Sequence, residues 1–420
     1  MEFFMSLSIL PAALAAALVS GAMQPVADTG LPPISLAEAL LIAESREEPG
    51  IETWRARADA LETRGEAESA LPDPSVRVGV ASVPLSDFDL EREAMTQAQV
   101  SVRQMFPRGE TRELRRARRE AEADGARAGM ALEAREIRRT VRQRWLELYY
   151  WERARDLTLR RREEMDRLGE VATAVFASGR ANSHDVIRVD LETAMLGTRL
   201  VDIERQSETI RADLARYLGA DADRPLTAQM PVLPALPDGT DAVAALAAHP
   251  GIRAHNARIE ASERELDIAR QAFRPAWALD AGYGLRGSRS DVASIGVSVE
   301  VPLFNRTGRE AGVSAARQAR SAEELARQAS LLDLRRQLDR SVRQHRWLDD
   351  TIALHEREVL PRARETVEAV LAAYENEQAD FAELVRAELA LLDAELALVR
   401  MQVDAGQALA DILFLTGDVQ

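Results

Sequence analysis

Two adjacent heptad stripes run along the C-terminal segment 383–415, and they constrain the fold more than any other feature. The first stripe repeats small or apolar residues at spacings of three and four: Leu384, Ala387, Leu391, Ala394, Leu398, Met401, Ala405, Ala408, Ile412 and Leu415. The second runs beside it: Val385, Leu389, Leu392, Leu396, Val399, Val403, Gly406, Ala410 and Leu413. Such spacing is typical of a coiled-coil helix. Because two stripes require a neighbour on each flank, we expect one stave of a helical bundle or closed tube.

The same segment occurs earlier in the chain. A shift of 198 positions without gaps carries Tyr374 onto Phe176, Asp380 onto Asn182 and Gly417 onto Gly219. Farther upstream, Pro49-Gly50-Ile51 recurs as Pro250-Gly251-Ile252. The chain is therefore interpreted as two tandem copies of a unit of roughly 200 residues, which is too long for a solenoid repeat.

Each copy also contains two segments of period two, which predict strands with one apolar and one polar or small face. In the first copy Val76, Val78 and Val80 alternate with Arg77 and Gly79. A long helical segment follows each strand pair and extends to roughly 100 Å at 1.5 Å per residue. A short helix before the strands, stacked end to end on the helix after the turn, would nearly match that length.

These patterns predict a mainly α-helical protein with a small β part, arranged as strand, strand, long helix, turn and helix in each repeat. For the first repeat (35–219) we expect strands at about 75–83 and 96–105, a long helix at about 110–176, a turn at 177–183 and a helix at 184–218. For the second (242–417) we expect strands at about 276–285 and 294–301, a long helix at about 309–374, a turn at 375–380 and a helix at 381–415. A proline-rich linker, 220–241, joins them.

Composition narrows the function. The net charge of −15 argues against nucleic acid as a partner. Cysteine is absent, which excludes disulfides, thiolate metal sites and a lipid-modified N-terminal cysteine. An apolar run ending in Ser20-Gly21-Ala22 predicts a signal peptide over residues 1–22, and no later segment is apolar enough for a transmembrane helix.

The four strands allow two interpretations. Alternation alone is typical of an ordinary half-buried sheet that covers a core. However, strands of roughly 8 to 10 residues also suit a tilted membrane crossing, and the polar loops, export signal and very long helices favour it. Because four strands cannot close, several chains would have to supply one barrel. Three chains would give twelve strands, an even number within the usual range.

The two turns carry acidic residues whose first role is structural. Asp380 can cap the following helix while Glu383 reaches back as a capping box, and Asn182 and Asp185 occupy the matching places in the first copy. If several hairpins converge, the same carboxylates would form acidic rings at the mouth of a passage and favour cations.

The sequence shows no pattern of an enzyme. The five histidines lack metal-ligand spacing, and glycine-rich phosphate loops and nucleophile motifs are missing. We interpret the basic runs 115–119 and 160–162, which are interleaved with glutamate, as solvated helix faces. No catalytic residue, cofactor or metal site is predicted.

The ordered set of motifs resembles TolC-type outer-membrane efflux channels. It comprises the duplicated elements, Pro-Leu-Phe-Asn-Arg-Thr-Gly at 302–308, and Gly179 with Asp185-Val186 at the turn. The segments 70–74, 95–96 and 104–107 look most like the branch that serves heavy-metal pumps of the Czc and Cus kind. The resemblance implies a homotrimer in the outer membrane of a Gram-negative bacterium, with a twelve-stranded barrel and a helical periplasmic tunnel.

The resemblance also implies sites and partners. The periplasmic aperture would be held by Asp185, Glu383, Tyr374 and Arg386, the last standing where a second acid is common. A periplasmic adaptor would contact the turns, and an inner-membrane pump, of the resistance-nodulation-division type, would supply the cargo. The turn residues are Gly179, Arg180, Ala181, Asn182, Gln378, Ala379 and Asp380.

The sequence therefore predicts the channel component of a tripartite efflux pump, a passive duct for heavy-metal cations. The alternative is a periplasmic coiled-coil adaptor or scaffold that has a small sheet and no pore.

Overall fold

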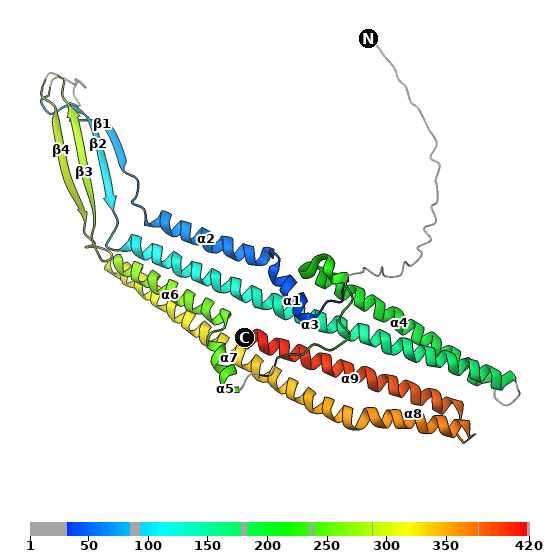
Figure 1. The fold of residues 1–420 in the computed structure, drawn as a ribbon. Helices are drawn as coiled ribbons and strands as arrows, with labels where there is room; N and C mark the ends of the chain where they lie inside the picture. The colour runs from blue at the N-terminus through cyan, green and yellow to red at the C-terminus, as the bar shows by residue number, and fades with distance from the viewer. Residues whose placement is uncertain are drawn as a thin grey trace, which may run out of the picture.

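The computed structural model describes residues 32–84, 93–177, 183–234, 236, 239–287, 289–376 and 378–417. The expected signal peptide, 1–22, lies outside these residues. The described chain is a long rod, with the strands at one end and the turns between long helices at the other (Figure 1). It is mainly helical with one small sheet, which confirms the fold class.

Both halves of the chain contain the same order of elements. The first half has α1 (Leu36–Ser45), α2 (Pro49–Ser69), β1 (Ser75–Ala81), β2 (Gln97–Phe106), α3 (Thr111–Ala177), α4 (Ser183–Leu218) and the short 3-10 helix η1 (Gly219–Asp223). The second half has α5 (Gly239–Ala247), α6 (Pro250–Gln271), β3 (Ala276–Leu285), β4 (Val292–Glu300), α7 (Arg306–Leu354), the π-helical turn η2 (His355–Val359), α8 (Leu360–Glu375) and α9 (Phe381–Thr416).

Local sequence accounts for several helix starts. The Ser35 hydroxyl accepts a hydrogen bond from the Glu38 backbone N–H (3.2 Å) and so caps α1. The helices α2 and α6 begin at Pro49 and Pro250, the prolines of the repeated Pro-Gly-Ile phrase. Proline suits the first turn of a helix because its missing N–H would have no partner there.

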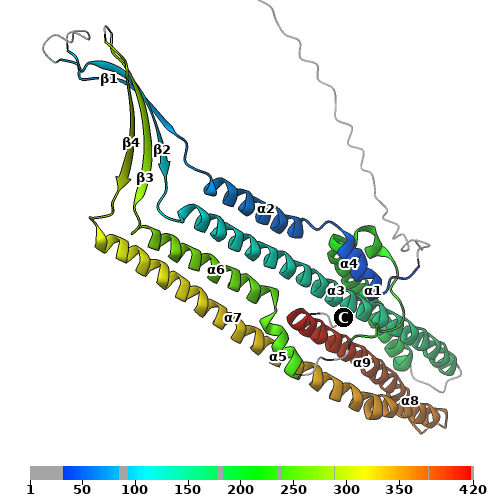
Figure 2. The ribbon, with the colours of Figure 1, turned by 60° about the vertical axis from the view of Figure 1, so that its left-hand side comes forward.

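Short helices extend the long staves. The helix α2 packs along the part of α3 nearest the sheet and α4 along the remainder, while α6 and α9 both pack against α3 and α7 (Figures 1 and 2). Thus α2 lies roughly in line with α4, and α6 lies roughly in line with α9. This is the end-to-end stacking that the helix lengths predict.

The core lies between these staves. Trp145 and Leu146 of α3 are fully buried, and Leu146 also contacts Gly406 of α9, where an added Cβ would lie 3.0 Å from its Cδ1. All members of both heptad stripes on α9 are buried or half-buried. Their neighbours are α3 on one flank and α7 and α8 on the other. The prediction of two neighbours is thus confirmed.

The second long stave is interrupted where periodicity predicts one continuous helix over 309–374. The turn η2 breaks it immediately before Pro361. Proline lacks an N–H and its ring collides with the carbonyl four residues earlier, so a wider turn accommodates it. At the start of this turn, His355 Nε2 lies 2.8 Å from the Ala394 carbonyl oxygen of α9. The heptad pattern contains no trace of the break because it records side chains and not backbone bonds.

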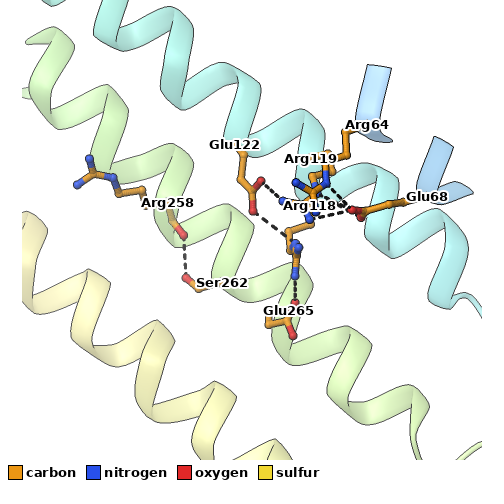
Figure 3. A network of polar contacts seen from close by, with 8 residues as sticks. All are labelled: Arg64, Glu68, Arg118, Arg119, Glu122, Arg258, Ser262 and Glu265. Atoms are coloured by element: carbon orange, nitrogen blue, oxygen red, sulfur yellow. Dashed lines mark hydrogen bonds and ion pairs between the residues drawn. The ribbon is translucent and has the colours of Figure 1, made fainter. Parts of the chain in front are cut away.

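A network of charges joins three helices just below the sheet (Figure 3). Arg119 of α3 binds Glu68 of α2 (2.8 Å) and Glu122 (2.7 Å), while Arg118 binds Glu265 of α6. The hydrogen bond from Arg119 lowers the pKa of Glu68 to about 2, so this carboxylate stays ionised through the physiological range. The run 115–119 is therefore partly a set of inter-helix contacts and not only a solvated face.

The four strands form one antiparallel sheet in the order β1-β2-β3-β4. Its register aligns Val76, Val102, Ala281 and Ile295 in one row and Val78, Val100, Tyr283 and Ala293 in the next. These rows form an apolar face that is open to the surroundings: Ile295 is 83% exposed and Val78 75%. Among the described residues no helix packs on the sheet, and its outer edges, on β1 and β4, are unpaired.

The opposite face of the sheet is polar or small. It carries Arg103 and Asp280, whose charged atoms lie 3.7 Å apart, and Ser298, whose hydroxyl donates to Asp280 (2.7 Å). The sheet thus has two chemically distinct faces, and the described residues form no core beneath either. None of the helices in the described ranges is both long and apolar enough to span a membrane.

Candidate functional site at the helical tip

The end of the rod remote from the sheet brings together four helix termini: the last turns of α3 and α8 and the first turns of α4 and α9 (Figure 1). The hydrophobic cluster that holds them includes Met165, Ala172, Val189, Phe381 and Val385, all buried. The described helix ends therefore form a packed unit at the tip.

Asp380 starts α9 as an N-cap. Its backbone is extended (φ −84°, ψ 158°), and Oδ1 accepts a hydrogen bond from the Glu383 N–H at 2.7 Å. On the other side of the turn the Gln378 N–H donates to the Ala373 carbonyl at 2.8 Å, which closes the end of α8. The structural role expected for Asp380 is present, and the Glu383 side chain remains exposed.

Tyr374 and Asp185 lie near each other at the tip although they belong to different repeats. The Tyr374 ring packs edge to face on Phe381 (centroids 5.6 Å apart) and touches the same cluster as Val186. Burial raises the pKa of the Tyr374 hydroxyl, and the negative charge of Asp185 raises it further by a smaller amount. The hydroxyl therefore stays protonated and can donate a hydrogen bond. The Asp185 side chain is only 16% exposed, and its Oδ1 lies 3.3 Å from His184 Nε2.

Arg386 lies in a groove between α4 and α9 with a volume of about 480 Å³. The groove has Ile187, Leu191 and Val385 along its apolar part and His184, Arg188 and Arg386 as its basic groups. Arg188 and Arg386 are equivalent in the two repeats, so the duplication places two cations on one groove. The structure therefore places the Asp185 carboxylate near the Tyr374 hydroxyl, whereas Glu383 and Arg386 are exposed on the first turns of α9.

The remaining turn candidates divide in two. Gln378, Ala379 and Asp380 belong to the described part of the turn before α9. Gly179, Arg180, Ala181 and Asn182 lie outside the described residues, and with them the expected cap at Asn182.

Sequence reasoning missed a buried cluster of charges above the tip. Arg161 of α3, only 8% exposed at its side chain, contacts Glu388 of α9, and its Nη1 binds Glu164 at 2.7 Å. Glu395 lies between Arg161 (3.7 Å) and Arg364 of α8 (3.6 Å). The interpretation of the run 160–162 as fully solvated is thus wrong for Arg161. The available signal was the spacing of Glu388 and Glu395, seven residues apart beside the heptad stripes.

Within the part of the chain that the structure describes, no group of three or more His, Asp or Glu side chains could hold a metal ion. The arrangement offers instead a set of acidic and basic groups on converging helix ends, which can shape an opening or receive a partner.

Comparison with known proteins adds two findings. A family model described as outer membrane efflux protein matches residues 242–418, which form the second half of the chain. No curated protein sequence matches the chain.

Solved structures of membrane proteins share the fold. The outer membrane protein VceC of Vibrio cholerae has 17% identity over 92% of this chain and 97% of its own, with a TM-score of 0.75. A membrane protein from Pseudomonas aeruginosa has 15% identity over 91% and 92%, with a TM-score of 0.78. The CmeC outer membrane channel of Campylobacter jejuni has 11% identity over 91% and 85%, with a TM-score of 0.74. At these identities the likeness establishes the fold.

Proposed function

We propose that three copies of this chain form a passive duct through the outer membrane, as the exit component of an efflux pump. The observation that carries the proposal is the sheet: it has an open apolar face, an opposite polar face and two unpaired edges, on a rod whose fold is shared with outer-membrane channels.

The chemistry of the sheet favours lipid on one side and water on the other. An apolar face of this extent is stable when it meets hydrocarbon, while the polar face would line an aqueous lumen. In hydrocarbon the open edges would leave backbone donors and acceptors unsatisfied, so the edges of neighbouring chains must pair. Three chains would supply twelve strands, an even number typical of such barrels.

The helices support the same assembly. Exposed apolar side chains lie on α4, at Ile187, Leu191 and Val201, and on α7, at Leu332 and Trp347. These helices lie on opposite sides of the bundle (Figure 1). A neighbouring chain would bury both sets and continue the two-sided packing seen around α9, which would close the staves into a tunnel.

The tip would then be the periplasmic aperture and docking end. Three copies of Asp185 and Glu383 would surround the opening, with Tyr374 and Arg386 as their neighbours in each chain. The turn residues Gln378, Ala379 and Asp380, together with 179–182, would contact a periplasmic adaptor.

An inner-membrane pump, of the resistance-nodulation-division type, would deliver the cargo. We propose that this cargo is heavy-metal cations, because segments 70–74, 95–96 and 104–107 resemble the branch of efflux channels that serves heavy-metal pumps.

A periplasmic adaptor or scaffold without a pore is the second candidate. A soluble scaffold would have to cover the apolar face of the sheet with its own helices, yet the described helices leave Val78 and Ile295 open. This observation favours the duct.

Fractionation and planar-bilayer recording test the proposal together. The full chain should appear in outer-membrane fractions as a heat-modifiable trimer, and the purified trimer should conduct ions in planar bilayers. A water-soluble periplasmic monomer without conductance would overturn the proposal and support the scaffold.

A further inference from the structure

The polar face of the sheet carries one charge that its neighbours do not compensate. Arg77 of β1 is aligned by the strand register with Ser101, Gly282 and Ser294, all small and neutral. Two residues along β1, Gly79 leaves open space, since an added Cβ would meet no atom within 4 Å. The Arg77 guanidinium therefore stands on a surface of small side chains and is exposed.

The other charges on this face are matched. Arg103 and Asp280 lie 3.7 Å apart, and Asp280 also accepts from Ser298. Glu300 is bound by Arg108 at 2.5 Å, so this acid is engaged at the foot of β4. Within the described part of the sheet, Arg77 is the one charged residue of the polar face that has no partner.

Trimerisation would multiply this charge. Strands about 4.8 Å apart and tilted by about 40° give a twelve-stranded barrel a radius of roughly 12 Å. Three arginines at one height in such a lumen act on passing ions over the Debye length, which is about 10 Å at 0.1 M salt and about 30 Å at 0.01 M. Rings of arginine favour anions in pores, as rings of acids favour cations.

We infer that Arg77 gives the outer, barrel section of the passage a preference for anions, opposite in sign to that of the acidic tip. This inference rests on the proposed function. A cation that passes the tip then meets arginines of the same positive charge at the outlet, which repel it. The exit therefore favours cargo that leaves as an anion or as an anionic complex of a metal.

The test is the reversal potential of the purified trimer in planar bilayers under a KCl gradient. Arg77→Gln should lower the chloride-to-potassium permeability ratio by roughly twofold or more at low salt, and the change should shrink toward 1 M KCl because screening removes it. Arg77→Lys keeps the charge and should retain the ratio of the unaltered protein. Repeating the series on an Asp185→Ala background separates the barrel from the tip.

Three results would overturn the inference. The permeability ratio could be unchanged in Arg77→Gln, as it would be if a neighbouring chain compensated the charge. It could change equally in Arg77→Lys, which would make side-chain size the cause. It could also change independently of salt. A conducting trimer with any of these results leaves the duct intact, whereas failure to form a conducting trimer at all counts against the duct itself.

Discussion

Arg161 of α3 and Glu388 of α9 form an ion pair inside the helical bundle, where both side chains are largely shielded from water. The pair joins the hairpin of the first repeat to that of the second, about midway between the core and the tip. Burial of two charges is costly unless each compensates the other. Removing one partner should therefore do more damage than removing both.

The Arg161→Met variant should be less stable by about 3 kcal/mol or more, because it leaves Glu388 buried without its counter-charge. In the double variant Arg161→Met with Glu388→Leu, much of that loss should be recovered. Chemical denaturation of the solubilised protein measures both. Arg160→Met, one residue away on the exposed face, is the matched control and should change stability by less than about 0.5 kcal/mol. If the losses of stability in Arg161→Met and in Glu388→Leu alone simply add up in the double variant, with no recovery, the pairing is contradicted.

The fold follows from periodicity to a large extent. Alternation at Val76, Val78 and Val80 predicts both the strand and its apolar face, and the stripes on α9 predict its two neighbours. These features are local, because a period of two or of three and four is set by the geometry of one strand or helix. The closeness of Tyr374 and Asp185 is not a local feature of this kind, because the two residues lie in different repeats.

The features that sequence alone did not predict depend on contacts between distant segments. Arg161 has the same local pattern as Arg160 and Arg162, and only the approach of α9 makes it a buried residue. The turn before Pro361 depends on backbone hydrogen bonds, which the helical periodicity of the side chains does not record. Arg77 was visible in the strand, but its lack of a partner is apparent only once the register places Ser101, Gly282 and Ser294 beside it.

At the tip, we predict that Glu383→Ala will weaken the block of the pore by divalent cations. Three exposed carboxylates around the opening would attract such ions, and their loss removes that attraction. Asp380→Ala separates this effect from capping, because it should reduce helix stability by about 1 kcal/mol while leaving Glu383 in place. Single-channel recording with added cation measures block, and thermal unfolding measures the cap. If block is unchanged in Glu383→Ala while stability falls, the residue serves the helix alone.

His249 should make stability depend on pH. Its ring is 2% exposed, Nδ1 accepts from the Gly251 N–H at 3.1 Å, and it packs against Phe414. Burial, together with a smaller effect of the positive charges of Arg135 and Arg253, lowers its pKa from 6.5 to about 4. The unfolded chain therefore binds a proton between these values that the folded chain does not, so stability falls as pH drops below 6.5.

From pH 7.5 to pH 5 this histidine should account for a loss of about 2 kcal/mol, seen as a lower unfolding midpoint by circular dichroism. The His249→Asn variant keeps a side chain that can cap α6 but does not titrate, so its midpoint should depend less on pH. An equally steep pH dependence in the variant would assign the effect to other groups.

The last prediction concerns the two faces of β4, where adjacent residues offer a matched pair. Ile295 is on the apolar face and Ser294 on the polar face, and both are exposed in the single chain. If the apolar face meets hydrocarbon, Ile295→Arg places a charge in the bilayer at a cost of about 2–4 kcal/mol, whereas Ser294→Arg adds a charge to an aqueous lumen at little cost. The amount of heat-modifiable trimer in outer-membrane fractions should therefore drop for Ile295→Arg and remain near normal for Ser294→Arg. Equal tolerance of the two substitutions would mean that both faces meet water, and a larger loss for Ser294→Arg would mean that the polar face is the packed one.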